Sequence, residues 1–255
     1  MFKVAIPSYF RSNAIASKTL AVLGLGGVPV SDIFIFVVPE EEAAYKNACS
    51  GYNVIVGVKG LVEQRKFIQR YFPLNTNIVM MDDDVEDIFK ASYKNEKHVK
   101  EVIPDLSDLF VFMFQRMAQE NVSLCGICAH TNLKFALAGA EVSTNLKYVV
   151  GALYLIKNLR MPEVQPGQDI LEDTERTVLY YKKEKKILRF NHICIKTKYF
   201  GKGGLESPDR LMRHSGASQE LVERYPAYLR LKVSKNLIDA KIRTGKALKE
   251  QQLAE

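Results

Sequence analysis

The chain has 255 residues, of which 47% are hydrophobic and 25% are charged, and this ordinary globular composition argues against wholesale disorder. No apolar run approaches the ~20 residues that span a bilayer, and the start of the chain lacks the basic and apolar regions of a signal peptide, so we expect neither. Four cysteines are too few for a disulfide scaffold and indicate a reducing, cytoplasmic compartment. Lysine and arginine number 36 against 29 acidic residues, an excess compatible with a polyanionic partner.

The first ninety residues alternate between strand patterns and helix patterns. Four short apolar runs are typical of buried strands and cover residues 3–6, 33–38, 53–58 and 77–81. A helical pattern with apolar positions from 15 to 23 follows the first run, and another over 61–72 follows the third. Strands that alternate with helices imply a parallel sheet. The predicted fold class is therefore α/β, with a Rossmann-type, mostly parallel central sheet flanked by helices.

Beyond residue 90 the alternation weakens. The patterns predict helices over 105–120 and 169–181, strands over 123–129, 148–156 and 187–196, and loops over 162–167 and 200–208. The last stretch, 218–255, is expected to be mostly helical and basic. We predict one domain over 1–215, followed by a basic helical extension over 216–255 that packs on it.

The strongest chemical signal is the triplet Asp82-Asp83-Asp84 directly after the fourth strand. Three adjacent carboxylates repel one another, and without a cation or hydrogen-bond donors this arrangement lowers stability. Mg²⁺ and Mn²⁺ prefer such hard oxygen ligands, and ligands of parallel sheets bind at the carboxyl ends of the strands. The position therefore predicts a divalent metal site. The alternative is a solvated acidic turn that caps a following helix.

Other predicted strand ends also carry polar residues. The segment Pro7-Ser8-Tyr9-Phe10-Arg11 follows the first strand, and Glu40 follows the second. A rigid turn there exposes a hydroxyl and backbone groups, and Arg11 can meet an anion near a helix N-terminus. The alternative is a proline turn with a surface arginine.

Arg65 lies on the apolar stripe that Leu61, Ile68 and Phe72 form in the predicted helix over 61–72. A charged residue on a buried face needs a partner. That partner is either a diphosphate or an acidic residue at a strand end, and an ordinary structural ion pair explains the arginine equally well. Gln64 lies on the edge of the same face.

Downstream, Glu172 and Asp173 open a predicted helix, where acidic residues also serve the helix dipole. His214 lies in a polar, basic segment after a glycine-rich loop, which suits an anion or a metal contact. Of the other histidines, His98 is expected to be solvated and His130 and His192 to be structural. Cys125 and Cys128 have CxxC spacing without a second pair, so we interpret them as core thiols.

Two stretches carry the excess positive charge. The first stretch, 182–202, contains seven lysines and one arginine, and Glu184 is its one acidic residue. In the second stretch, 230–249, the one acidic residue is Asp239. Runs of one sign at this density favour contact with a phosphate backbone over a solvated surface. The candidate nucleic-acid contacts are Lys198, Lys202, Arg210, Arg213, Lys241, Arg243 and Lys246.

In their order and spacing, these motifs resemble glycosyltransferases of the GT-A fold over roughly residues 3–215. The motifs that carry the resemblance are Pro7–Arg11, Gln64-Arg65, Asp82–Asp84, Gly151-Ala152, Leu171-Glu172-Asp173 and His214. The resemblance implies that the first half of the sheet binds a nucleoside diphosphate sugar, expected to be a UDP-sugar, through Pro7, Ser8, Tyr9, Arg11, Glu40, Gln64, Arg65, Asp82, Asp83, Gly151 and Ala152.

The same resemblance assigns a metal ion, Mn²⁺ or Mg²⁺, to Asp82, Asp84 and His214. It makes Asp173 the catalytic carboxylate of an inverting enzyme, with Glu172 beside it. The compact size, the Pro7–Arg11 opening and the block from Val79 to Val85 resemble the TET/JBP-associated branch. That branch modifies hydroxymethylated pyrimidines in phage DNA, which implies DNA containing 5-hydroxymethylcytosine as acceptor and the host cytoplasm as location.

Three other functions remain open. A GT-A glycosyltransferase that acts on polysaccharide, lipid or protein would share every donor-site residue. A sugar nucleotidyltransferase also combines a sheet, Mg²⁺ and carboxylates, but the glycine-rich phosphate loop after the first strand is missing. A non-catalytic nucleic-acid-binding protein would leave the carboxylates at 82–84 and 172–173 without a shared purpose.

Overall fold

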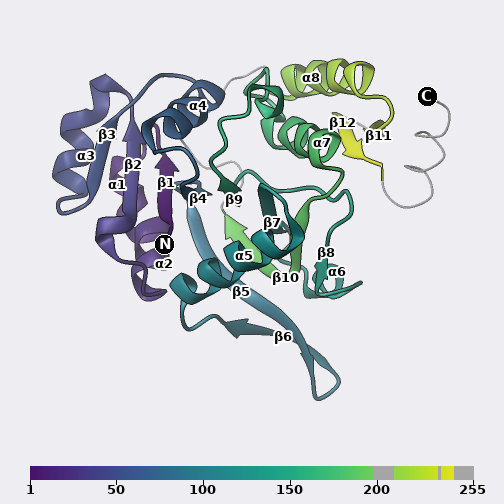
Figure 1. Cartoon of the computed structure of the whole chain (residues 1–255), viewed down its shortest axis with the longest axis horizontal. Helices are drawn as coiled ribbons and strands as arrows, with labels where there is room; N and C mark the ends of the chain where they lie inside the picture. Colours follow the sequence, from purple (N-terminus) through teal and green to yellow (C-terminus); the bar gives the residue numbers. More distant parts are fainter. Residues whose placement is uncertain (198–209, 235–236, 244–255) are drawn as a thin grey trace.

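The computed structural model describes residues 1–197, 210–234 and 237–243. One large sheet lies at its centre (Figure 1), and four parallel strands form its first half in the order β3-β2-β1-β4. They are β1 (Lys3–Pro7), β2 (Ile33–Val37), β3 (Asn53–Val56) and β4 (Asn77–Met81). All four predicted strands are confirmed. β1, β2 and β4 are mostly buried, whereas β3 lies at the edge of the sheet and is half-buried.

The second half of the sheet continues from β4 in the order β9-β7-β10-β5-β6, and β8 pairs with β10. These strands are β5 (Val85–Lys94), β6 (Lys97–Val102), β7 (Leu124–Cys128), β8 (Val142–Ser143), β9 (Leu153–Lys157) and β10 (Leu188–Thr197). β7 and β10 are parallel, whereas β9 runs antiparallel to both β4 and β7. The sheet is thus parallel in its first half and mixed in its second.

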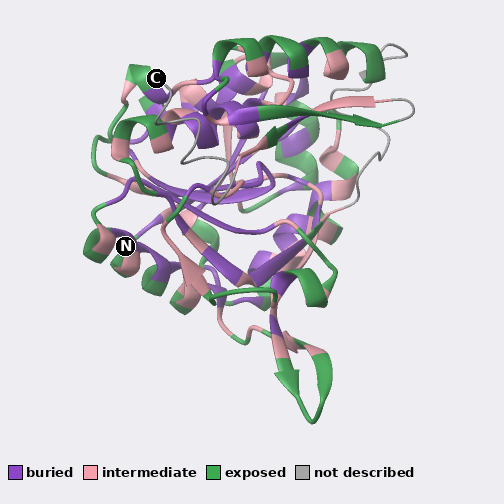
Figure 2. Cartoon of the chain, turned by 90° about the vertical axis from the view of Figure 1, so that its right-hand side faces the viewer, coloured by how far each residue is buried: buried purple, intermediate pink, exposed green. Residues whose placement is uncertain are grey.

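Sequence analysis does not predict the β5–β6 hairpin. β5 begins directly after the aspartate triplet, so the alternative of a capped helix at this point is wrong. The outer part of the hairpin projects from the molecule and is exposed (Figure 2), and β6 has no buried residue. A segment that faces solvent on both sides has no apolar periodicity to reveal it.

Helices cover both faces of the sheet, because successive strand residues point to opposite sides. Val4 and Ile6 pack in the core under the first helical segment, α3 and α5, whereas Ala5 packs under α4 and α7. The helices are α1 (Ser12–Ile15), a π-helical turn (Ala16–Leu20), α2 (Ala21–Leu25), α3 (Glu42–Ala48), α4 (Leu61–Tyr71), α5 (Leu106–Glu120), α6 (Leu133–Ala136) and α7 (Glu172–Glu184). Three 3₁₀ turns lie at Val30–Asp32, Pro39–Glu41 and Pro162–Val164.

The C-terminal part packs on α7 (Figure 1). It comprises α8 (Arg210–Arg224) and a hairpin of β11 (Leu229–Ser234) and β12 (Leu237–Ile242). Val178 of α7 contacts a cluster that includes Leu221 and Leu229. The expectation of a mostly helical extension therefore holds for α8 and is wrong for the hairpin, whose apolar residues alternate with basic ones at the period of a strand. α8 also runs through the predicted division at 215/216.

Across the described residues, no helix combines the length and the apolar character needed to cross a bilayer.

Candidate active site

Polar residues at the ends of β1 and β4 form one network. The Ser8 hydroxyl donates to Oδ2 of Asp83 at 2.5 Å. Nη1 of Arg11 donates to Oδ1 of Asp83 at 2.6 Å and to Oδ2 of Asp84 at 2.9 Å. β1 and β4 are parallel neighbours, so their carboxyl ends reach the same edge of the sheet. The structure therefore brings the predicted Ser8–Arg11 motif onto the predicted aspartate triplet.

Two residues that sequence analysis missed support this network from α3 and the turn before it. The Tyr45 hydroxyl lies 2.6 Å from the Ser8 hydroxyl and accepts from the backbone N–H of Arg11 at 3.0 Å. The Glu41 carboxylate accepts from the backbone N–H of Phe10 at 2.9 and 3.0 Å. Glu41 is buried, whereas the predicted Glu40 is exposed. Burial raises the pKa of Tyr45 to about 12, which keeps its hydroxyl protonated near neutral pH.

Arg65 connects the aspartate triplet to the second half of the sheet. Its Nη2 donates to Oδ1 of Asp82 at 2.9 Å and to the carbonyl oxygen of Gly151 at 3.1 Å, and its Nη1 donates to Glu172. The guanidinium is buried, so it needs the partners that sequence analysis predicted for it. One of them, Asp82, is an acidic residue at the end of a strand, which is one of the partners that sequence analysis predicted for Arg65.

Gln64 is placed differently from its predicted role. Its Oε1 accepts from the backbone N–H of Val58 at 2.8 Å and stabilises the loop between β3 and α4. A Cβ at Gly57 would lie 2.1 Å from this oxygen, so any other residue there would displace the Gln64 amide. The side chain is buried.

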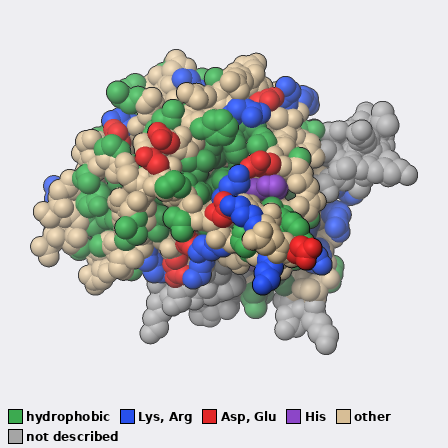
Figure 3. Space-filling view, turned by 90° about the horizontal axis from the view of Figure 1, so that it is seen from below, with side chains coloured by type: hydrophobic (Ala, Val, Ile, Leu, Met, Phe, Trp, Pro, Cys, Tyr) green, Lys and Arg blue, Asp and Glu red, His purple; other side chains and the backbone are tan. Residues whose placement is uncertain are grey.

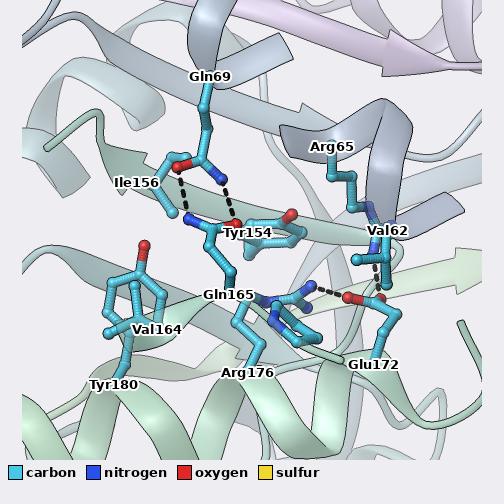
Figure 4. A pocket seen from close by; sticks show the side chains of 11 residues that line it. Val62, Arg65, Gln69, Tyr154, Ile156, Val164, Gln165, Glu172, Arg176 and Tyr180 are labelled. Carbon is cyan, nitrogen blue, oxygen red and sulfur yellow. Dashed lines mark hydrogen bonds and ion pairs between the residues drawn. The ribbon is translucent and has the colours of Figure 1, made fainter. Parts of the chain in front are cut away.

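Glu172 is a buried anion held by two arginines (Figure 4). Arg65 and Arg176 each donate to one of its carboxylate oxygens. Arg176 also stacks on the Tyr154 ring, with its guanidinium carbon 3.6 Å from the ring centroid. Burial alone would raise the pKa of Glu172, but the positive charges of Arg176 and Arg65 outweigh it and lower the pKa. Glu172 therefore anchors the site and is a poor proton acceptor, which weakens its predicted catalytic role.

Asp173, the next residue, has the character of a base. Its Oδ2 accepts from the Tyr148 hydroxyl and from the backbone N–H of Gly151 at 3.3 Å, and its Oδ1 accepts from the N–H of Thr174 at 2.8 Å. Burial and the negative charge of Glu172 raise the pKa of Asp173. A raised pKa makes this carboxylate a better proton acceptor than an ordinary aspartate. Tyr148 was missed because no motif surrounds it.

Asp82 and Asp84 are the two carboxylates of the triplet that are predicted to bind a divalent ion. The Asp82 side chain is 34% exposed, and burial of its charge together with the neighbouring carboxylates raises its pKa to about 7. The backbone N–H of Asp82 is fixed by the carbonyl oxygen of Ala152 at 2.9 Å. Burial also raises the pKa of Asp84 despite the contact with Arg11. Mg²⁺ is commonly held by one or two carboxylates plus water and phosphate oxygens, so these two side chains fit such an ion.

His214 lies on α8, and its Nε2 is 3.2 Å from Oδ1 of Asp239. Within residues 1–197, 210–234 and 237–243, no group of three or more His, Cys, Asp or Glu side chains is arranged to hold a metal. The structure therefore does not bring His214 together with Asp82 and Asp84. The order of motifs along the chain suggested His214 as a metal ligand, but this order does not determine the distance between residues in the fold.

The predicted nucleic-acid contacts fall into three groups. Lys198, Lys202 and Lys246 lie outside the described residues, as does the side chain of Arg210. Arg213 is exposed on α8, and Lys241 forms an ion pair with Asp239. Nε of Arg243 donates to the carbonyl oxygens of Pro226 and Leu229 at 3.0 and 2.9 Å. Arg243 therefore closes the base of the hairpin.

On the face that carries the β5–β6 hairpin, basic and acidic side chains are interspersed (Figure 3). Lys94 pairs with Glu101 at 2.6 Å, and Lys100 pairs with Asp87. Mixed signs are typical of a solvated surface. This face is therefore a poor candidate for a phosphate backbone.

Solved structures with a similar fold include proteins in complex with UDP-GlcNAc, UDP or GDP-Man. TarS 1–349 from S. aureus in complex with UDP-GlcNAc has a TM-score of 0.54 at 14% identity, covering 87% of this chain and 66% of that chain. Glucosyl-3-phosphoglycerate synthase from Mycobacterium tuberculosis, with Mn²⁺, UDP and glucosyl-3-phosphoglycerate, has a TM-score of 0.53 at 11% identity and coverages of 96% and 88%. The mannosyltransferase PcManGT from Pyrobaculum calidifontis, with GDP-Man and Mn²⁺, has a TM-score of 0.53 at 12% identity and coverages of 88% and 63%. These likenesses define the GT-A fold.

The family follows from the sequence match. Over residues 2–204 the chain matches the TET-Associated Glycosyltransferase family, and it belongs to that family. The resemblance found in the motifs is thereby confirmed. A search of curated proteins finds no significant match. The chain spans about two thirds of the length of the TarS and PcManGT chains.

The close packing around Gly151 gives a first prediction. A Cβ at this position would lie 2.9 Å from Oε1 of Glu172, which two arginines hold in place. Gly151→Ala should therefore displace Glu172 or Asp173 and lower the turnover number by ~10²-fold, the scale of a 1 Å misplacement. Steady-state kinetics would measure it. Gly24→Ala is the matched control, since a Cβ there meets nothing within 4 Å. Equal turnover in both variants would contradict this account.

Proposed function

We propose that this chain transfers a sugar from a nucleoside diphosphate sugar, namely a UDP-sugar, to the hydroxymethyl group of 5-hydroxymethylcytosine in DNA. The observation that carries the proposal is the buried guanidinium of Arg65. It contacts Asp82 at the donor end of the sheet, and it contacts Gly151 and Glu172 beside Asp173. One arginine thus joins the expected diphosphate side of the site to the expected base.

The donor side has the groups that a nucleotide needs. The rings of Tyr9 and Phe10 lie next to Ser8 with centroids 4.3 Å apart, and Phe10 is 63% exposed at a φ of 54°. An exposed aromatic ring in a strained backbone conformation suits stacking on a nucleobase. Arg11 and Arg65 add positive charge on either side of Asp82 and Asp84. The relatives described above were solved with UDP-GlcNAc, UDP or GDP-Man.

The proposed reaction is a displacement at the anomeric carbon. Asp173 takes the proton of the acceptor hydroxyl while the acceptor oxygen forms its bond to the anomeric carbon. The bond from that carbon to the diphosphate breaks, and the nucleoside diphosphate leaves with the electron pair. Mn²⁺ or Mg²⁺ bound by Asp82 and Asp84 would supply charge neutralisation for the departing diphosphate. Tyr148 and Gly151 orient the Asp173 carboxylate, and inversion of configuration is the expected outcome.

The DNA acceptor is supported by the family and by surface charge. The sequence resembles a branch that modifies phage DNA, which would place the reaction in the host cytoplasm. In the register of the C-terminal hairpin, Arg230 of β11 lies opposite Lys241 of β12, and Lys232 lies opposite Asp239. Arg230 and Lys232 are exposed two residues apart, so they lie on one face of β11. Such a face can contact successive phosphates.

The proposal is tested by product analysis. The protein is incubated with Mn²⁺, a panel of sugar nucleotides, and DNA that contains either cytosine or 5-hydroxymethylcytosine, and the DNA is then digested to nucleosides. A hexose or pentose mass increment on 5-hydroxymethylcytosine alone is the expected result. Transfer to polysaccharide, lipid or protein in the same assay, with none to DNA, would favour the other acceptor classes.

Salt dependence tests the DNA surface. Binding to duplex DNA should weaken with salt, with a log–log slope of about −0.9 per phosphate contact. The double variant Arg230→Glu, Lys232→Glu should raise the apparent KM for DNA several-fold and flatten this slope by about 2, because each lost contact removes about one counterion. Lys46→Glu on α3 is the control, since Lys46 is exposed and pairs with Glu42 in its own helix. An unchanged slope in the double variant would make the hairpin a solvated surface.

A further inference from the structure

A cavity of about 260 Å³ lies between the end of β7 and β10, and no residue of the proposed donor site lines it. Its polar and aromatic lining consists of Cys128, His130, Phe135, Lys147, Arg189 and Asn191. Lys147 is followed directly by Tyr148, whose hydroxyl donates to Asp173. A residue of the cavity, Lys147, is therefore the immediate neighbour in the chain of the residue that orients the expected base.

Two cations line the cavity, Lys147 and Arg189. Within the described ranges, no Asp or Glu side chain acts on Lys147 or Arg189. Burial and the charge of Arg189 lower the pKa of Lys147, and burial lowers the pKa of Arg189. The acidic group that acts on both is the Cys128 thiol, whose pKa is lowered mainly by its hydrogen bond with Cys194. Donors that are crowded in this way suit carbonyl, ring-nitrogen or phosphate acceptors of a ligand.

Asn191 contributes a hydrogen-bond acceptor to the lining of the cavity, in contrast to the donors Lys147 and Arg189. It is only 5% exposed, and its Nδ2 donates to the carbonyl oxygen of Ala140 at 2.8 Å and to the Ser143 hydroxyl at 3.1 Å. These two hydrogen bonds fix the orientation of the amide. Oδ1 of Asn191 is buried without a partner in the structure. A buried acceptor left unpaired is unfavourable, so this oxygen is suited to an N–H donor from a ligand.

The size and the rim of the cavity fit a single base. Its volume lies below the ~300–1,000 Å³ of pockets for drug-sized ligands. Phe135 of α6 is 65% exposed, and its ring centroid lies 5.8 Å from that of His130. Exposed rings of this kind stack on unpaired bases. Enzymes that act on a base in duplex DNA extrude it into such a pocket.

We propose that this cavity is the acceptor pocket and that it selects an amino-pyrimidine, an inference that rests on the proposed function. Oδ1 of Asn191 accepts from the exocyclic amine of 5-hydroxymethylcytosine, and Lys147 and Arg189 donate to its N3 and O2. 5-Hydroxymethyluracil presents an oxygen to Asn191 in place of the amine, and two acceptors facing each other are repulsive. The pocket therefore distinguishes the two hydroxymethylated pyrimidines that DNA can offer.

Equilibrium binding tests the pocket without requiring turnover. Fluorescence anisotropy measures the affinity for duplexes with one 5-hydroxymethylcytosine or one 5-hydroxymethyluracil, in the presence of Mn²⁺ and UDP. The wild type should prefer the cytosine duplex by at least ~10-fold, and Asn191→Ser should remove this preference. Lys147→Met, which keeps an unbranched side chain of similar length and removes the charge, should weaken binding of the cytosine duplex by ~5–10-fold. Lys46→Met should bind like the wild type, and UDP affinity should be the same in all variants.

The outcomes separate the pocket from the proposed function. No preference in the wild type, or an unchanged preference in Asn191→Ser together with unaffected binding in Lys147→Met, would overturn the pocket. If glycosylated nucleoside still formed, the proposed function would stand. Binding that prefers the cytosine duplex and depends on Asn191, but without transfer from any sugar nucleotide, would support the pocket and overturn the proposed function. A melting temperature for each variant shows whether it folds.

Discussion

Asp84→Ala is expected to abolish turnover and the metal-dependent part of donor binding, while the fold stays intact. The carboxylate lies at the end of β4, where it contacts Arg11 at 2.9 Å. Its removal leaves Arg11 with its second partner, Asp83, at 2.6 Å, so no buried charge is stranded. A site that holds a divalent ion with two carboxylates loses that ion when one is removed. Titration of UDP with and without Mn²⁺ measures the effect.

The matched control for this prediction is Asp87→Ala. Asp87 lies three residues further along the chain on β5, and its carboxylate pairs with Lys100 at the surface. This variant removes the same charge from the same region and should bind UDP and Mn²⁺ like the wild type. If Asp84→Ala kept full UDP affinity in the presence of Mn²⁺, the aspartate triplet would not be a metal site.

Asp173→Asn is expected to lower turnover by at least ~10²-fold, the scale of general base catalysis, with donor binding nearly unchanged. The amide has the same size and keeps an oxygen for the Tyr148 hydroxyl and the N–H of Gly151, and it gives up the hydrogen bond from the N–H of Thr174. What it loses is the ability to take a proton. Steady-state kinetics with saturating acceptor, together with UDP titration, separates the two effects.

The same residue sets an expected pH dependence. Burial and the charge of Glu172 raise the pKa of Asp173 above the usual aspartate value of 3.8. A base acts in its deprotonated form, so turnover should fall as the pH decreases through this raised pKa and reach a plateau above it. The residual activity of Asp173→Asn should lack this acidic limb. Asp169→Asn is the control, because Asp169 serves the backbone N–H of Val62 at the start of α4. Near-normal turnover in Asp173→Asn would assign the base elsewhere.

Several parts of the site could be predicted because they depend on local patterns. Residues 77–81 are apolar and are followed at once by Asp82–Asp84, which identifies both a buried strand and the acidic residues at its end. The same holds for β1 and Ser8. Neighbouring parallel strands end at one edge of the sheet, and the structure brings these two motifs into contact there, through Ser8 and Asp83.

Other parts were out of reach because they depend on contacts across the fold. The run Glu40–Glu42 does not reveal which carboxylate turns inward, and packing selected Glu41 for the N–H of Phe10. Tyr148 meets Asp173 across 25 residues, and Arg65 meets Glu172 across 107. His214 shows the reverse case, because its place in the order of motifs matched a metal ligand and the fold paired it with Asp239.

The sequence by itself determined the α/β class, the four parallel strands, the positions of the acidic motifs and the family, since all of these are written in local hydrophobic period and in motif order. The tertiary structure decided how each acidic residue is used. It gave Glu172 two arginines and lowered its pKa, and it left Asp173 with hydrogen-bond donors, partial burial and a raised pKa. These neighbouring carboxylates cannot be told apart along the chain, because the charge and burial that separate their chemistry come from side chains that only folding brings near.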